Sequence, residues 1–146
     1  MITLNQVDGI LPEADIVIGC MPHTPLTQGF MNRKRLESMK ETAIFVNVGR
    51  GTLVDHDALA DVLNAGKIYG AALDVTCPEP LPQDHPLWKC RNVIITPHIS
   101  GQTFAGLKDK ENYFFRVCRE NLESYRDGKP LQNLVDLKTG YRVTTN

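Results

Sequence analysis

The sequence contains no Gly-x-Gly-x-x-Gly segment, the glycine-rich turn that brings a helix N-terminus against the pyrophosphate of a dinucleotide. It has no apolar run close to the roughly 20 residues that span a bilayer, and no basic segment followed by an apolar core at its N-terminus. Neither sign of charge is in excess, because the net charge is −1 and the pI is about 6.4. We therefore expect a cytoplasmic protein that interacts with neither membranes nor nucleic acid.

Cysteine and histidine are scarce, with four of each in the 146 residues. The cysteines include no Cys-x-x-Cys pair, and neither residue type has the spacing of metal ligands. We expect four reduced thiols, as is usual inside cells, and no metal site. The residues concerned are Cys20, Cys77, Cys90 and Cys118, and His23, His56, His85 and His98.

The length of the chain and its hydrophobic content of 42% suffice for one domain with a real core, so residues 1–146 are expected to form a single domain. Apolar runs predict four strands, at residues 15–21, 43–48, 69–75 and 92–96. Apolar residues at helical spacing predict three helices, at about residues 33–40, 56–65 and 103–127.

Polar residues mark where the first two helices begin, and glycines mark where two of the helices end. Asn32 and Asp55 are suited to N-caps, and Gly66 and Gly128 are suited to the position after a helix. Continuously apolar strands that alternate with helices indicate an α/β fold with a parallel sheet covered on both faces. Residues 131–146 are expected to form an extended tail.

Three chemically distinct side chains follow consecutive predicted strands: Arg50 in NVGRG, Glu79 in CPEP and His98 in TPHISG. Ligands of open α/β sheets bind beyond the carboxyl ends of the strands, so we expect these side chains to share one crevice. Arginine binds carboxylates bidentately, histidine exchanges protons, and a carboxylate orients an imidazole. Taken singly, they are equally explained as a surface arginine, a solvated loop carboxylate and a histidine at a strand end. Together they favour a substrate anchor and an acid/base pair.

Other residues near these strand ends leave two interpretations open. Asp74 is acidic near the end of a buried strand and needs a partner, which is either a carboxamide or a neighbouring loop. Gly49, Gly51 and Gly101 are either plain turn residues or places where a ligand approaches the main chain. Trp88 lies either at the rim of a pocket or in ordinary packing.

Four long stretches carry a resemblance to a known family: PEADIVIGCMPHTPLTQGFMN, MKETAIFVNVGRGTLVDHDAL, GAALDVTCPEPLPQDHPLW and NVIITPHISGQT. Their order and spacing resemble the D-isomer-specific 2-hydroxyacid dehydrogenases, which include phosphoglycerate dehydrogenases and glyoxylate/hydroxypyruvate reductases. The resemblance covers about residues 12–135. It implies the C-terminal part of a Rossmann-like, doubly wound NAD-binding domain with about four parallel strands.

The resemblance also implies a reaction, namely hydride transfer between NAD or NADP and a small 2-keto or 2-hydroxy acid. It implies that Arg50 binds the substrate carboxylate, that His98 is the general acid/base paired with Glu79, and that Asp74 contacts the nicotinamide carboxamide. Further residues that it places beside the cofactor are Met21, Pro22 and Thr27 on the adenosine side, and Val48, Gly49, Arg50, His98, Ile99, Ser100 and Gly101 on the nicotinamide side.

The family pattern is incomplete in this sequence, because the glycine-rich half of the cofactor domain and the substrate domain are missing. We therefore expect weak cofactor binding and little or no activity from the chain alone. The strand at 15–21 would form an open apolar edge, which invites pairing with a second copy or a complementing chain. A short strand at residues 1–4 is another way to cover that edge.

Three interpretations follow from the sequence. The chain is a catalytic half of an enzyme, inactive or very weak alone; or an interaction module that pairs through its sheet edge; or half of a split enzyme whose other strands come from a second polypeptide. Which acid is the substrate depends largely on a domain that the sequence does not contain, and the motif that distinguishes NAD from NADP is missing as well.

Overall fold

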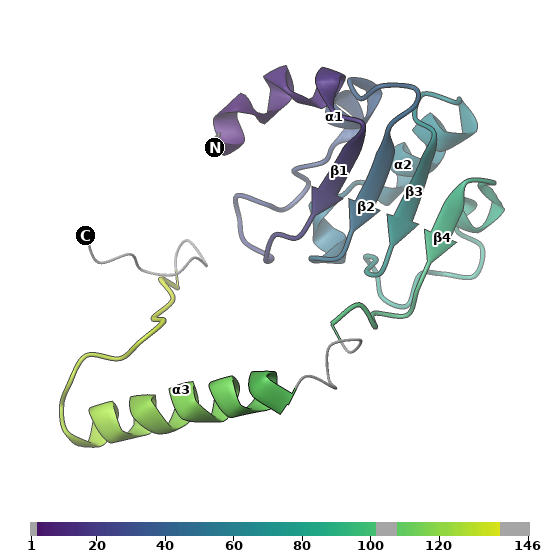
Figure 1. Cartoon of the computed structure of the whole chain (residues 1–146). Helices are drawn as coiled ribbons and strands as arrows, with labels where there is room; N and C mark the ends of the chain where they lie inside the picture. The colour runs from purple at the N-terminus through teal and green to yellow at the C-terminus, as the bar shows by residue number, and fades with distance from the viewer. Residues whose placement is uncertain (1–2, 102–107, 138–146) are drawn as a thin grey trace. The chain divides into compact units, whose positions relative to one another are not determined.

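The computed structural model describes residues 3–101 and 108–137 (Figure 1). Contacts within the chain divide it into two compact units, with the division between His98 and Ile99. Each unit is described by itself. No helix in the described part of the chain is long and apolar enough to cross a membrane.

The first unit is built on a four-stranded sheet in the order β1-β2-β3-β4, with every neighbouring pair parallel. In register, one row across the sheet consists of Ile18, Val46, Ala72 and Ile94. The parallel α/β fold is therefore confirmed, and each strand is shorter than predicted. The strands are β1 Ile16–Gly19, β2 Ile44–Asn47, β3 Gly70–Leu73 and β4 Val93–Ile95.

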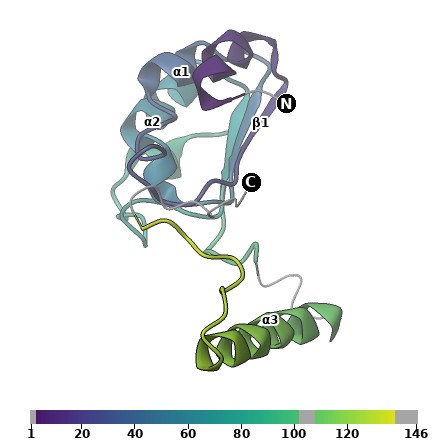
Figure 2. The same cartoon turned by 90° about the vertical axis from the view of Figure 1, so that its left-hand side faces the viewer.

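Two helices, α1 (Arg33–Glu37) and α2 (His56–Asn64), lie on one face of this sheet (Figure 2). Both predicted caps are confirmed, because the Asn32 side chain accepts from Arg35 N at 3.1 Å and the Asp55 side chain accepts from Ala58 N at 2.9 Å. Gly66 ends α2 with a φ of 66°. The core between helices and sheet consists of apolar side chains that are 0–1% exposed, among them Leu36, Phe45, Leu59, Val62 and Leu73.

The opposite face of the sheet does not match the prediction. Ile16, Ile18 and Ile94 point away from the helices and are 60%, 60% and 66% exposed. The expectation that helices cover both faces is therefore wrong for the first unit as described. Periodicity could not reveal this, because a strand with one uncovered apolar face reads the same as a strand buried on both.

The residues before β1 form helical turns rather than a strand. A 3-10 helix covers Leu4–Gly9, and a second covers Leu11–Glu13. Thr3 and Gln6 form a capping box at the start of the first helix, with Thr3 N donating to Gln6 Oε1 at 2.9 Å. This cap stabilises a helical start, so the suggested strand at residues 1–4 is wrong for its described part.

The second unit contains the helix α3, Lys108–Arg126, which confirms most of the helix predicted at 103–127. Its predicted apolar residues Phe104 and Leu107 lie outside the described residues. Gly128 follows the helix with a φ of 65°. The chain beyond is described to residue 137, where Gln132 N donates back to Asn121 Oδ1 of α3 at 2.7 Å.

Candidate active site

His98 and Glu79 meet beyond the C-terminal ends of β4 and β3. His98 Nδ1 lies 2.8 Å from Glu79 Oε1, and both side chains are a little under half exposed. With Glu79 ionised, Nδ1 is the donor, so the second ring nitrogen is left for proton exchange with a ligand. The structure thus brings together the imidazole and the carboxylate of the predicted acid/base pair.

The main chain holds His98 in an unusual conformation. Its φ is 56°, in the left-handed region that few residues other than glycine adopt. Its backbone N–H is shared between two acceptors, Asp74 O at 2.9 Å and Thr96 O at 3.0 Å. These two bonds fix the backbone at the position where the imidazole must point toward Glu79.

A buried asparagine shapes the turn that carries Arg50. Asn47 ends β2 with a fully buried side chain, whose Oδ1 accepts from Gly49 N at 3.2 Å and whose Nδ2 donates to Arg50 O at 3.0 Å. The exposed Arg50 side chain donates from Nη1 to Gly49 O at 2.7 Å. The turn is therefore braced from inside while the guanidinium lies at the surface.

Glycines let this turn pack against the loops of its two neighbouring strands. A Cβ at Gly49 would lie 2.6 Å from Met21 O and 2.8 Å from Met21 N. A Cβ at Gly51 would overlap the carbonyl group of Thr76 and lie 2.7 Å from Cys77 N. Only glycine permits such close approach of two backbones. The strand ends of β1, β2 and β3 are thus joined through main-chain contact.

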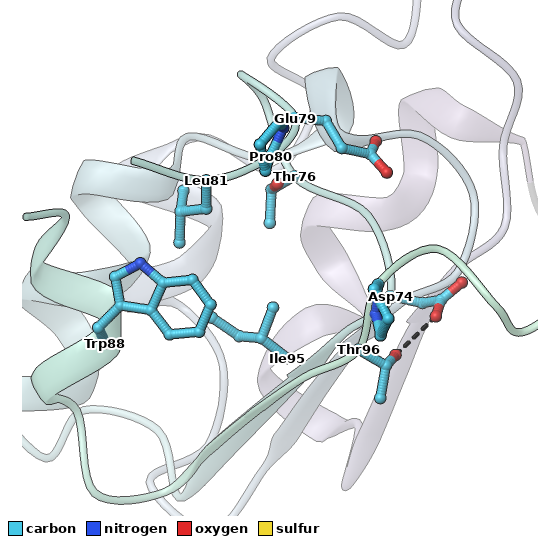
Figure 3. A pocket seen from close by; sticks show the side chains of 9 residues that line it. Asp74, Thr76, Glu79, Pro80, Leu81, Trp88, Ile95 and Thr96 are labelled. Atoms are coloured by element: carbon cyan, nitrogen blue, oxygen red, sulfur yellow. Dashed lines mark hydrogen bonds between the residues drawn. The ribbon is translucent and has the colours of Figure 1, made fainter. Parts of the chain in front are cut away.

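Asp74 is 5% exposed and lies directly after β3. Its Oδ1 accepts a hydrogen bond from Thr96 Oγ1 at 2.6 Å, which satisfies part of the need of a buried carboxylate for donors (Figure 3). Both residues line a cavity of about 330 Å³ that Glu79 also borders. The neighbouring-loop role and the ligand role considered for Asp74 are therefore compatible.

The remaining predicted cofactor residues are placed as follows. Thr27 is 1% exposed and its hydroxyl donates to Pro22 O at 2.6 Å and accepts from Thr24 N at 2.9 Å, so it braces its own loop. Met21 is half-buried, whereas Val48 is 39% exposed at the surface. Ser100 and Gly101 belong to the second unit.

Sequence reasoning missed Asn47, Thr76 and Thr96. Each is a polar residue at or just beyond the end of an apolar strand, and each holds a neighbouring loop. Thr76, for example, donates from Oγ1 to Pro78 O at 2.9 Å in the loop that carries Glu79. A polar residue at the carboxyl end of a buried strand was the signal that could have identified them.

A second pair of imidazoles lies away from these strand ends. His56 is 6% exposed, and its ring lies edge-on to that of His85 with centroids 6.3 Å apart. Burial, with a smaller contribution from His85, holds the pKa of His56 below its ordinary value. Among the described residues, His56 Nε2 is the buried side-chain nitrogen or oxygen without a hydrogen-bond partner.

With this geometry established, the sequence can be compared with known proteins. Residues 1–100 match the family model described as D-isomer specific 2-hydroxyacid dehydrogenase, NAD binding domain. The chain belongs to this family. It is 45% identical over 125 residues to the human glyoxylate reductase/hydroxypyruvate reductase, and 35% identical over 136 residues to the D-3-phosphoglycerate dehydrogenase of Archaeoglobus fulgidus.

Solved structures of the family agree with the fold. A D-isomer specific 2-hydroxyacid dehydrogenase from Xanthobacter autotrophicus Py2, in complex with NADPH and MES, superimposes with a TM-score of 0.79 at 38% identity over 94% of this chain. The match covers 55% of that structure. The alignment with the human relative covers 86% of this chain and 37% of the relative, and the alignment with the archaeal relative covers 93% of this chain and 25% of the relative. It therefore spans about half or less of the proteins that it matches.

Proposed function

We propose that the chain carries the substrate-anchoring and acid/base half of an NAD(P)-dependent dehydrogenase that interconverts small 2-keto and 2-hydroxy acids. The observation that carries the proposal is the 2.8 Å contact between His98 Nδ1 and Glu79 Oε1, with Arg50 following β2, the strand beside β3. A 2-keto acid offers a carboxylate to an arginine and a carbonyl oxygen that takes up a proton. Family membership supports the same chemistry.

The proton is exchanged at His98 Nε2, because the Glu79 carboxylate accepts from Nδ1. In reduction, Nε2–H donates its proton to the carbonyl oxygen; in oxidation, the neutral Nε2 takes the proton of the hydroxyl group. Glu79 then stabilises the imidazolium that forms. Arg50 exchanges its bond to Gly49 O for the substrate carboxylate. A bound nicotinamide supplies or accepts the hydride, which is chemistry that protein side chains lack.

The described residues fit the nicotinamide end of the cofactor. The buried Asp74 carboxylate is an acceptor suited to a carboxamide NH₂ group. They do not fit the pyrophosphate end, because both helices of the first unit, beginning at Arg33 and His56, are capped by their own Asn32 and Asp55 side chains. At each of these N-termini one main-chain N–H group is already bonded to the cap, and at α2 the cap is itself a carboxylate, which repels a phosphate. We propose that tight cofactor binding needs a complementing polypeptide.

The test is oxidation of NADH by glyoxylate, measured for this chain alone and after mixing with a separately expressed polypeptide that corresponds to the remainder of the human relative. We expect activity only in the mixture, and its loss when His98→Gln replaces the native chain. An inactive mixture whose two polypeptides form a stable complex would contradict the proposal, as would equal rates for the native and His98→Gln chains.

A second candidate function is an interaction module that pairs through its sheet. The observation favouring it is that β1 lies at the edge of the described sheet and exposes Ile16 and Ile18, which is the kind of edge that pairs with another chain. Sedimentation at micromolar concentration tests it. A dimer, or a complex with the complementing polypeptide, is the expected result, and a lone monomer under both conditions would contradict it.

A further inference from the structure

The cavity beside the acid/base pair has two chemically different ends (Figure 3). At one end Asp74 and Thr96 face one another, and Glu79 extends above them. The other end is bounded by Leu81, the Trp88 indole and Ile95, with Pro80 beside them. The function proposed above gives roles to Glu79 and Asp74 at the polar end and none to the residues of the apolar end.

Polar groups that line the apolar end already have hydrogen-bond partners. The Trp88 indole nitrogen donates to Pro82 O at 2.7 Å, so its ring offers carbon atoms to the cavity. The Thr76 hydroxyl donates to Pro78 O at 2.9 Å. The indole is nevertheless 51% exposed, which leaves a large apolar surface open to a ligand. What this end can recognise is therefore a hydrocarbon group.

We propose that this apolar end is a subsite for the side chain of the substrate, and that it selects 2-keto and 2-hydroxy acids whose side chain is aromatic or branched. Trp88, Leu81 and Ile95 are the specificity-determining residues. The proposal rests on the proposed function, because it takes Arg50 and the His98–Glu79 pair as the place where the carboxylate and the oxygen at C2 are bound.

The size and the charge of the cavity further restrict which substrate side chains it can accept. At about 330 Å³ the cavity is at the lower end of small-molecule pockets, so its apolar end has room for one ring or one branched chain at most. Among the described residues, its lining includes the carboxylates of Asp74 and Glu79 and no lysine or arginine. A phosphorylated side chain would therefore enter without a counter-ion and next to two negative groups, which is unfavourable.

The experiment uses three 2-hydroxy acids that share one head group: D-3-phenyllactate, glycolate and D-3-phosphoglycerate. Each is titrated into the ¹⁵N-labelled chain, and binding is followed by two NMR signals. The amides of Gly49, Arg50 and Gly51 report on the carboxylate, and the indole N–H of Trp88, the single tryptophan of the chain, reports on the subsite. Each buried methylene group contributes about fourfold in affinity, so phenyllactate should bind at least tenfold more tightly than the other two acids. Phenyllactate alone should move the indole signal.

Two substitutions on the same strand separate the subsite from general effects. Ile95→Thr keeps a β-branched residue but places a hydroxyl in the cavity wall. We expect it to weaken the binding of phenyllactate at least fivefold and to leave the affinity for glycolate unchanged. Ile94→Thr lies on the opposite face of β4, is 66% exposed, and should change neither affinity. Equal effects of the two substitutions, or equal affinity of phenyllactate and glycolate, would overturn the proposal.

Failure of the underlying function gives a different result. If no acid shifts the amide signals of Gly49, Arg50 and Gly51, the carboxylate site is wrong. The substrate subsite is then overturned as well, even if phenyllactate still shifts the indole signal. If all three acids move those amides and none moves the indole signal, the function stands and only the subsite is overturned. Displacement of phenyllactate from the indole by N-methylnicotinamide would assign the apolar end to the cofactor and would likewise overturn the proposal.

Discussion

Gly51 is the position where the smallest possible substitution should do the most damage. Its Cα packs directly against the peptide group between Thr76 and Cys77, so the added methyl group of Gly51→Ala would meet main-chain atoms. Unlike the end of a flexible side chain, this peptide group cannot rotate away. The loop after β3, which carries Glu79, would have to move away from the loop after β2, which carries Arg50.

The size of the effect follows from the cost of overpacking, which is typically about 1–3 kcal/mol. We expect about 3 kcal/mol of lost stability for Gly51→Ala, because the obstruction is backbone and not side chain. With a urea m-value of about 1.5 kcal/mol per molar, this lowers the unfolding midpoint by about 2 M. Gly9→Ala is the matched control, since a Cβ there has no other atom within 4 Å, and its effect should stay within about 0.5 kcal/mol.

The assay is urea unfolding followed by circular dichroism, with Trp88 fluorescence as a second probe in the same samples. Trp88 lies in the 3-10 helix Pro86–Lys89, away from Gly51 in the sequence, so agreement of the two probes shows that the whole first unit responds. Equal midpoints for Gly51→Ala and Gly9→Ala would refute the close approach of the two loops. Equal midpoints would also contradict the main-chain contact between the Arg50 turn and the segment after β3.

Other predictions concern pH, capping and catalysis. Burial, aided by His85, keeps the pKa of His56 low in the folded chain, whereas the unfolded chain takes up a proton there near pH 6.5. The free energy of unfolding should therefore fall as the pH drops below about 6.5. His56→Gln should reduce this pH dependence, which urea midpoints measured from about pH 8 to pH 5 would show. Asp55→Ala should cost about 1 kcal/mol in the same unfolding assay through loss of the α2 cap. The effect of Asp57→Ala should be smaller, because its 84% exposed side chain contacts His85 Nε2 at 3.4 Å but caps no helix. In the two-polypeptide NADH assay, Glu79→Gln should lower kcat about 100-fold with little change in KM for the keto acid, and an unchanged kcat would show that the carboxylate does not orient His98.

Much of the fold could be predicted because its signals are local. The caps at Asn32 and Asp55 and the turn at Gly66 follow from preferences of one or two residues, and all three are present in the structure. The uncovered face that Ile16 and Ile94 form could not be predicted, since whether an apolar face is covered depends on partners that lie elsewhere in sequence or in another chain.

The site divides in the same way. Strand ends and residue chemistry pointed to Glu79 and His98, and parallel topology brings them within 2.8 Å. The bracing residues Asn47 and Thr96 were not foreseen, because a buried amide or hydroxyl acquires its role from atoms that meet it only after folding. The sequence left the role of Trp88 open between pocket rim and packing, because the proposed subsite combines it with Leu81 of a loop and Ile95 of β4.

The segment that follows β3 connects three parts of the candidate site. It accepts a hydrogen bond from His98 N at Asp74 O, packs against Gly51 and carries Glu79. The positions of Arg50, Glu79 and His98 thus depend on one segment of the first unit. A displacement of this segment would therefore move all three side chains together.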